Sequence, residues 1–144
     1  MTGGGTYNSG TSATVIATAN SGYNFTNWKQ GSTVVSTSAS YTFTVTANRA
    51  LVATFAVVPP TVAQPILSPN GGTFFNKVKV TLSDSTSGAK IYYTTNGTTP
   101  TTSSKKYGNP FTLNTRGATI TVKTIATKGG YNNSAIASAS FTIQ

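Results

Sequence analysis

Ala135-Ile136-Ala137-Ser138-Ala139-Ser140-Phe141-Thr142-Ile143, near the end of the 144-residue sequence, gives the clearest indication of the fold class. Alanine, phenylalanine and isoleucine occupy its odd positions, whereas residues 138, 140 and 142 are serine or threonine. Successive side chains of a β-strand point to opposite faces of the sheet, so this alternation predicts one buried and one solvent-facing side. The stretch is therefore expected to be a strand of a sheet that packs on one face.

Shorter stretches with the same alternation precede it in the second half of the chain. Valine and leucine alternate with lysine and threonine over residues 77–82, and isoleucine and tyrosine alternate with lysine and threonine over residues 90–94. Residues 111–113 and 120–122 extend the series, and turns rich in glycine, asparagine and proline separate the segments. Several short strands with such turns predict a small antiparallel β-sandwich.

The first half of the chain also predicts strands and no helix. Residues 41–46 alternate an aromatic or aliphatic residue with threonine, and Leu51, Ala53 and Phe55 repeat the pattern. No segment has a helical repeat of useful length. A module this small buries little area, so we expect its aromatic residues to supply most of the core. The whole chain is therefore expected to be all-β.

A proline-rich segment, VVPPTVAQP at residues 57–65, predicts the boundary between the two halves. It holds three of the six prolines of the chain. Proline removes a backbone donor from any strand ladder and favours the extended polyproline II conformation. The sequence thus predicts a β module at 1–57, a semi-rigid linker at 58–64 and a sandwich at 65–144.

The composition argues against an enzyme. Ten lysines and arginines accompany a single acidic residue, Asp84, and the chain has no histidine or cysteine. Acid–base catalysis needs a group that titrates near neutral pH, and glycoside hydrolysis needs two facing carboxylates. Metal sites need several cysteine, histidine or carboxylate ligands. We therefore expect no catalytic residues, no metal site and no cofactor.

The surface and the start of the chain indicate a soluble protein. The 29 threonines and 16 serines predict a surface that is polar through hydroxyl groups. No run of 18 or more apolar residues occurs, which predicts that no segment inserts into a membrane. The start, MTGGGTYN, lacks the features of a signal peptide, and the sequence is interpreted as a piece of a longer chain.

Residues 3–56 resemble the divergent internalin B-type repeat of bacterial surface proteins. The resemblance rests on GTYNSG at 5–10, GYNFTNW at 22–28 and LVATF at 51–55. Such repeats usually begin with another strand before the glycine-rich turn. We therefore expect the first module to lack its first strand, which was either cut away or is supplied by a neighbouring repeat.

Residues 62–143 resemble the chitobiase/β-hexosaminidase C-terminal-type domain. PILSPNGG at 65–72, GAKIYYTTNGTTPT at 88–101 and KGGY at 128–131 carry this resemblance. The family turn usually reads Tyr-Thr-Thr-Asp-Gly, and Asn96 replaces the acid here, which a turn tolerates but a role for a carboxylate does not. The resemblance implies an immunoglobulin-like or fibronectin-like sandwich. Both families imply extracellular, non-catalytic modules beside carbohydrate-active or adhesive domains.

Four aromatic residues are candidates for carbohydrate binding, because sugar rings stack their C–H patches on aromatic faces. Trp28 offers the largest face, but core packing in a small module is the competing interpretation. Tyr92 and Tyr93 are neighbours in an expected strand, so one must face outward, and we expect this to be Tyr92. Tyr107 and Tyr131 lie beside glycines in expected loops, where a purely structural role competes with ligand binding.

Most of the positive charge belongs to the second module. The first module has only Lys29 and Arg49, whereas the second has eight basic residues and Asp84. Three interpretations remain: solubility and protection of strand edges, attraction of anionic glycan or cell wall, and, least favoured in the absence of any motif, nucleic acid. The lysines expected to form a basic face are Lys77, Lys79, Lys90, Lys105, Lys106, Lys123 and Lys128.

Two functional hypotheses follow. The leading one is a non-catalytic spacer that presents neighbouring domains of a larger secreted or cell-surface bacterial protein acting on or adhering to polysaccharide. The alternative is a carbohydrate-binding module that recognises polysaccharide through exposed aromatics and the basic face. The expected partners are neighbouring domains and a polysaccharide or cell-wall glycan, with neither nucleic acid nor membrane insertion.

Overall fold

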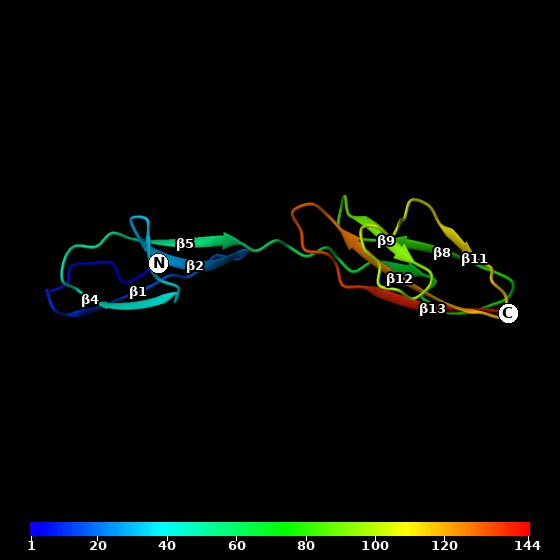
Figure 1. Cartoon of the computed structure of the whole chain (residues 1–144), viewed down its shortest axis with the longest axis horizontal. Coiled ribbons are helices and arrows are strands. Elements are labelled where there is room, and N and C mark those ends of the chain that lie inside the picture. Colours follow the sequence, from blue (N-terminus) through cyan, green and yellow to red (C-terminus); the bar gives the residue numbers. More distant parts are fainter. The chain divides into compact units, whose positions relative to one another are not determined.

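The computed structural model describes residues 1–144 and contains strands, turns and bends but no helix. The chain divides into two compact units, Met1–Val58 (unit 1) and Pro59–Gln144 (unit 2). Figure 1 shows the strands of each unit along the chain. No helix long and apolar enough to cross a membrane is present. The structure confirms the all-β prediction.

Unit 1 contains two small antiparallel sheets. The first pairs two strands, β1 (Ser12–Ile16) and β4 (Ser40–Thr44). The second has the order β3-β2-β5, formed by β2 (Tyr23–Gln30), β3 (Thr33–Ser36) and β5 (Leu51–Val57). The pairing of β2 with β5 shifts register between Phe25 and Asn27, which marks a bulge in β2.

An aromatic cluster forms the core of unit 1. Trp28 is completely buried, and its indole N–H donates a hydrogen bond to the carbonyl of Ala39 (3.2 Å). Phe25 lies against it with ring centroids 5.9 Å apart. Val15 and Ala17 are the other buried residues of this cluster. The aromatic residues thus dominate this core, as the sequence predicts.

The outer edge of β1 carries only one further residue pair. Thr2 forms an isolated antiparallel bridge with Ile16 through two backbone hydrogen bonds (2.9 and 3.1 Å). The order of the sheet is simply β1-β4, so no strand covers the remainder of this edge. The expected additional strand would pair with this edge of β1. In the structure, the segment around Thr2 pairs with the edge at one residue only.

Unit 2 is a sandwich of a five-stranded and a three-stranded sheet. The five-stranded sheet has the order β10-β9-β12-β13-β7 and is antiparallel except for the parallel pair β13–β7. Its strands are β7 (Gly72–Phe74), β9 (Lys90–Thr94), β10 (Lys105–Lys106), β12 (Thr119–Thr127) and β13 (Ala137–Ile143). The other sheet has the order β11-β8-β6, formed by β6 (Ile66–Ser68), β8 (Val78–Ser83) and β11 (Phe111–Leu113).

The core of unit 2 lies between these two sheets. Val80 from the three-stranded sheet and Val122, Phe141 and Ile143 from the five-stranded sheet are completely buried. Ser138 and Ser140 of β13 are exposed, as the alternation predicts. Fully burying side chains of this size stabilises a fold by about 1.5–3 kcal/mol each, so this core is the main stabilising feature of the unit.

The structure differs from the predicted linker at residues 58–64. Val62 is only 2% exposed and belongs to the core of unit 2. Thr61 forms a parallel bridge with Asn132, and the Ala63 N–H donates a hydrogen bond to the Thr86 hydroxyl (2.8 Å). The prolines remove donors only at their own positions, so the residues between them remain free to pair. Unit 2 therefore begins at Pro59.

Replacing Phe141 by alanine should destabilise unit 2 by about 3–5 kcal/mol, because the substitution leaves a cavity in a closed core. Phe75→Ala is the matched control, since Phe75 is 75% exposed and loses mainly a cation–π contact with Arg116. We expect the control to cost at most about 1 kcal/mol. Urea unfolding followed by circular dichroism measures both variants. Equal losses would contradict the placement of the core.

Gly3→Ala should detach the segment around Thr2 from β1. Gly3 has a φ of +89°, and a Cβ there would clash with the backbone oxygen of Thr14. The amide of Ile16 should then exchange its hydrogen about tenfold faster, since the strain is worth about 1–2 kcal/mol. Gly4→Ala should leave this rate unchanged, because its Cβ would contact nothing within 4 Å. Hydrogen exchange followed by NMR separates the two results.

Candidate functional site

The candidate ligand-binding surface is the outer face of the five-stranded sheet of unit 2. In β9, Ile91 and Tyr93 are buried, so Tyr92 and its alternate neighbours point to the opposite face. In β12, residues 122, 124 and 126 are completely buried, so the odd-numbered residues occupy the outer face. We call this surface the outer sheet face; its members on β9, β10, β12 and β13 are Lys90, Tyr92, Thr94, Lys106, Thr121, Lys123, Ile125, Thr127, Ser138, Ser140 and Thr142.

The strand register places Tyr92 at the middle of a short row. Lys106 of β10 is opposite Tyr92 on one side, and Ile125 of β12 is opposite it on the other. The adjacent row consists of Thr94, Lys123 and Ser138, from three neighbouring strands. Directly opposed residues have Cβ atoms about 4.5–5.5 Å apart. The aromatic ring of Tyr92 therefore lies among the aliphatic side chain of Ile125, the lysines Lys106 and Lys123, and hydroxyl groups.

Hydroxyl pairs continue this face toward β13. The hydroxyls of Thr119 and Thr142 are 3.0 Å apart, and those of Thr121 and Ser140 are 3.3 Å apart. Hydroxyls that pair only with one another retain further donor and acceptor capacity, which suits sugar hydroxyls or water. This arrangement can bind polar ligands.

The only acidic side chain lies away from this face. Asp84 follows β8, and its Oδ1 accepts a hydrogen bond from the Thr86 N–H (2.7 Å), which stabilises the turn before β9. No cluster of three or more histidine, cysteine, aspartate or glutamate residues is present. The lysines of the outer sheet face therefore have no anionic partner, and the field around them is positive.

The other candidate aromatic residues do not join Tyr92. Tyr107 packs edge-on against Tyr93 and Phe111, with centroid distances of 6.4 and 6.5 Å, and so belongs to the margin of the core. Tyr131, in the loop between β12 and β13, also packs against the core, and the Lys128 ammonium lies 4.3 Å from its ring centroid. Both rings pack within the protein, so the structure does not bring them together with Tyr92, and ligand binding by them stays a prediction.

Trp28 offers no open face for stacking, so the prediction that it binds a sugar in this way is wrong. Its side chain is completely buried in unit 1 and its indole N–H is already hydrogen-bonded. The competing interpretation, core packing, describes its place. A sugar ring would need a solvent-accessible face of the indole, which the surrounding side chains cover.

The predicted basic face is also corrected, because the seven lysines do not share one surface. Lys90, Lys106 and Lys123 lie on the outer sheet face. Lys79 alternates with buried valines of β8 and therefore faces outward from the other sheet. The ammonium of Lys105 lies 5.8 Å from the ring centroid of Tyr93, toward the inner side of the sheet. Lys77 precedes β8, and Lys128 lies beside Tyr131.

Sequence reasoning missed Ile125 as a member of the site. The predicted alternation covers residues 120–122, whereas β12 continues to Thr127. The signal was the unbroken run TITVKTIAT, whose even-numbered members include the buried Val122, Thr124 and Ala126. Extending the period of two through this run would have placed Ile125 on the same face of the strand as Lys123.

Comparison with protein families assigns each unit separately. Residues 1–59 match the family model described as the divergent InlB B-repeat domain, and residues 69–138 match the chitobiase/β-hexosaminidase C-terminal domain. The curated proteins include none that matches the chain. The matches confirm both resemblances and their order, and the second is consistent with the immunoglobulin-like β fold of unit 2.

Proposed function

We propose that this chain, a divergent InlB B-repeat domain followed by a chitobiase/β-hexosaminidase C-terminal domain, is a non-catalytic presentation module of a larger bacterial protein. In this role it would act outside the cell as a spacer for neighbouring domains that act on or adhere to polysaccharide. Both matched families are accessory domains and are typical of extracellular bacterial proteins. The second family name also links unit 2 to polysaccharide-related proteins.

One observation carries the proposal: the chain has a single acidic side chain, and its carboxylate is used in a turn. Asp84 accepts the Thr86 N–H, and neither a second acid nor any histidine or cysteine exists to complete a reactive pair. Hydrolysis of glycosides needs two carboxyl groups, one on either side of the scissile bond. The two units instead provide two separate cores within one chain, an arrangement that suits a spacer between neighbouring domains.

A second function, carbohydrate binding by unit 2, is favoured by the outer sheet face. Tyr92 lies between Lys106 and Ile125, with hydroxyl groups on the adjacent strands. An aromatic ring surrounded by hydrogen-bonding groups is the usual composition of a surface that binds sugar rings. The lysines would add attraction toward acidic polymers, which weakens as salt rises.

Retention of the purified protein on insoluble cellulose, chitin, xylan and bacterial cell wall, at low and at high salt, tests these two functions. The presentation role predicts no retention that survives high salt. Retention that survives high salt and is lost in Tyr92→Ala would instead establish carbohydrate binding and would contradict a purely presentational role. Tyr23→Ala is the matched control, because Tyr23 is 48% exposed and belongs to unit 1. Retention that disappears with salt would reflect only the positive field.

A further inference from the structure

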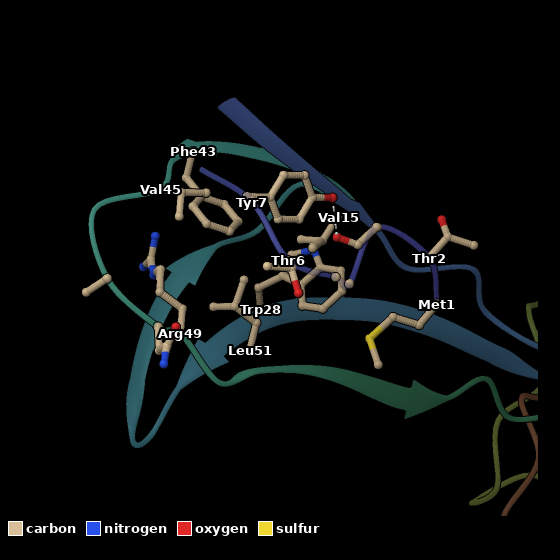
Figure 2. A pocket seen from close by; sticks show the side chains of 15 residues that line it. Met1, Thr2, Thr6, Tyr7, Val15, Trp28, Phe43, Val45, Arg49 and Leu51 are labelled. Carbon is tan, nitrogen blue, oxygen red and sulfur yellow. Dashed lines mark hydrogen bonds between the residues drawn. The ribbon is translucent and has the colours of Figure 1, made fainter. Parts of the chain in front are cut away.

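Unit 1 contains a hollow of about 670 Å³ that no sequence motif indicates. Figure 2 shows it between the N-terminal segment, both sheets and the connection from β4 to β5. Its volume lies within the range of about 300–1,000 Å³ that is usual for small-molecule sites. Its lining includes Thr6 and Tyr7 of the N-terminal segment together with Phe43, Asn48, Arg49 and Leu51.

The lining combines an apolar floor with a polar rim. The half-buried Phe43 and Leu51 form the accessible part of this floor, and they pack against the buried core residues Val15 and Trp28. Thr6, Tyr7 and Asn48, on the rim, are exposed and carry hydroxyl or amide groups. Gly4 adds no side chain, and a Cβ there would contact nothing within 4 Å, so the wall is open at this point. The hollow can therefore take up a ring that has both apolar and hydroxyl faces.

Arg49 is held in a fixed position at this hollow. Its Nε donates a hydrogen bond to Oε1 of Gln30 (2.8 Å), and its Nη1 donates one to the Tyr41 hydroxyl (3.4 Å). The guanidinium carbon lies 4.6 Å from the centroid of the Phe43 ring. A guanidinium group has five N–H donors, so most of them remain free for a ligand. The side chain has already lost much of its freedom, which lowers the entropic cost of binding.

The charge of Arg49 has no counter-ion in unit 1. The only acidic residue of the chain is Asp84, which belongs to unit 2. A planar guanidinium pairs best with a carboxylate, through two parallel hydrogen bonds. Lys29, the one other basic side chain of unit 1, does not line the hollow. A single fixed cation suits one carboxylate and does not suit a polyanion such as nucleic acid, which needs several phosphate contacts.

We propose that this hollow binds a carboxylate-bearing sugar residue of an acidic polysaccharide. The carboxylate pairs with Arg49, the ring lies against the accessible side chains Phe43 and Leu51, and its hydroxyls reach Thr6, Tyr7 and Asn48. The proposal concerns residues of unit 1 alone, so it is independent of the outer sheet face of unit 2. Its failure would leave the presentation role intact, and Tyr92→Ala should not affect it.

Titration with an oligogalacturonate, followed by calorimetry and by tryptophan fluorescence, tests the proposal on the whole chain. Trp28 is the single tryptophan and lies at the hollow, so a change in its emission locates the ligand in unit 1. We expect saturable binding with a change in emission. The methyl ester of the same oligosaccharide should bind at least about tenfold more weakly, because it lacks the carboxylate charge. Equal binding of both, or binding of neither, would overturn the proposal.

Arg49→Gln should weaken binding of the oligogalacturonate about tenfold or more. Lys29→Gln is the matched control, because it removes the same charge from the same unit without altering the hollow, and it should bind as the unaltered protein does. Equal affinities of the two variants would contradict the proposed site.

A second variant keeps the proposal testable if Arg49→Gln fails to fold. Ala47→Phe adds a ring at an exposed position that lines the hollow, so it should narrow the hollow without disturbing the core. We expect the same loss of binding with an unchanged circular dichroism spectrum. Unaltered binding by a folded Ala47→Phe protein would overturn the proposal.

Discussion

The alternation of side chains along each strand is the constraint on which both units depend. The chain has one acidic residue, so networks of ion pairs cannot support the fold, and burial of one face of each sheet must do so. Phe141 and Ile143 of β13 illustrate this, since both are completely buried, whereas Ser138 and Ser140 before them are exposed and Thr142 between them is half-buried. A slip of one residue in register would expose this entire face, so the register of each strand is strongly specified.

The same constraint decides which chemistry is available at the surface. Tyr92 and Tyr93 are neighbours, yet only Tyr93 enters the core. Lys105 and Lys106 are also neighbours, and they point to opposite sides of β10. What remains outside is a mixture of aromatic, hydroxyl and cationic groups without a carboxylate. Such a surface suits contact with polar molecules, which is consistent with the accessory role that we propose.

Local patterns predicted the fold, whereas contacts between distant segments decided the features that were missed. The period of two in residues 135–143 was sufficient to predict a one-sided strand and the all-β class. The burial of Val62 was not predictable, because it depends on packing within unit 2 and on the pairing of the adjacent Thr61 with the distant Asn132. The prediction of a single basic face was wrong for a related reason, because assigning Lys79 to a surface requires knowledge of which sheet contains β8. The hollow beside Arg49 arises only when residues 1–7 lie against β1 and the β4–β5 connection.

Hydroxyl-radical footprinting followed by mass spectrometry tests the central claim that strand alternation separates surface chemistry from core. The reagent oxidises aromatic side chains according to their exposure to solvent, so it compares neighbouring residues directly. The account predicts that Tyr92 is oxidised clearly faster than Tyr93, and that Trp28 is protected although tryptophan is intrinsically reactive. Oxidation of Tyr93 as fast as that of Tyr92, or rapid oxidation of Trp28 in the folded protein, would contradict it.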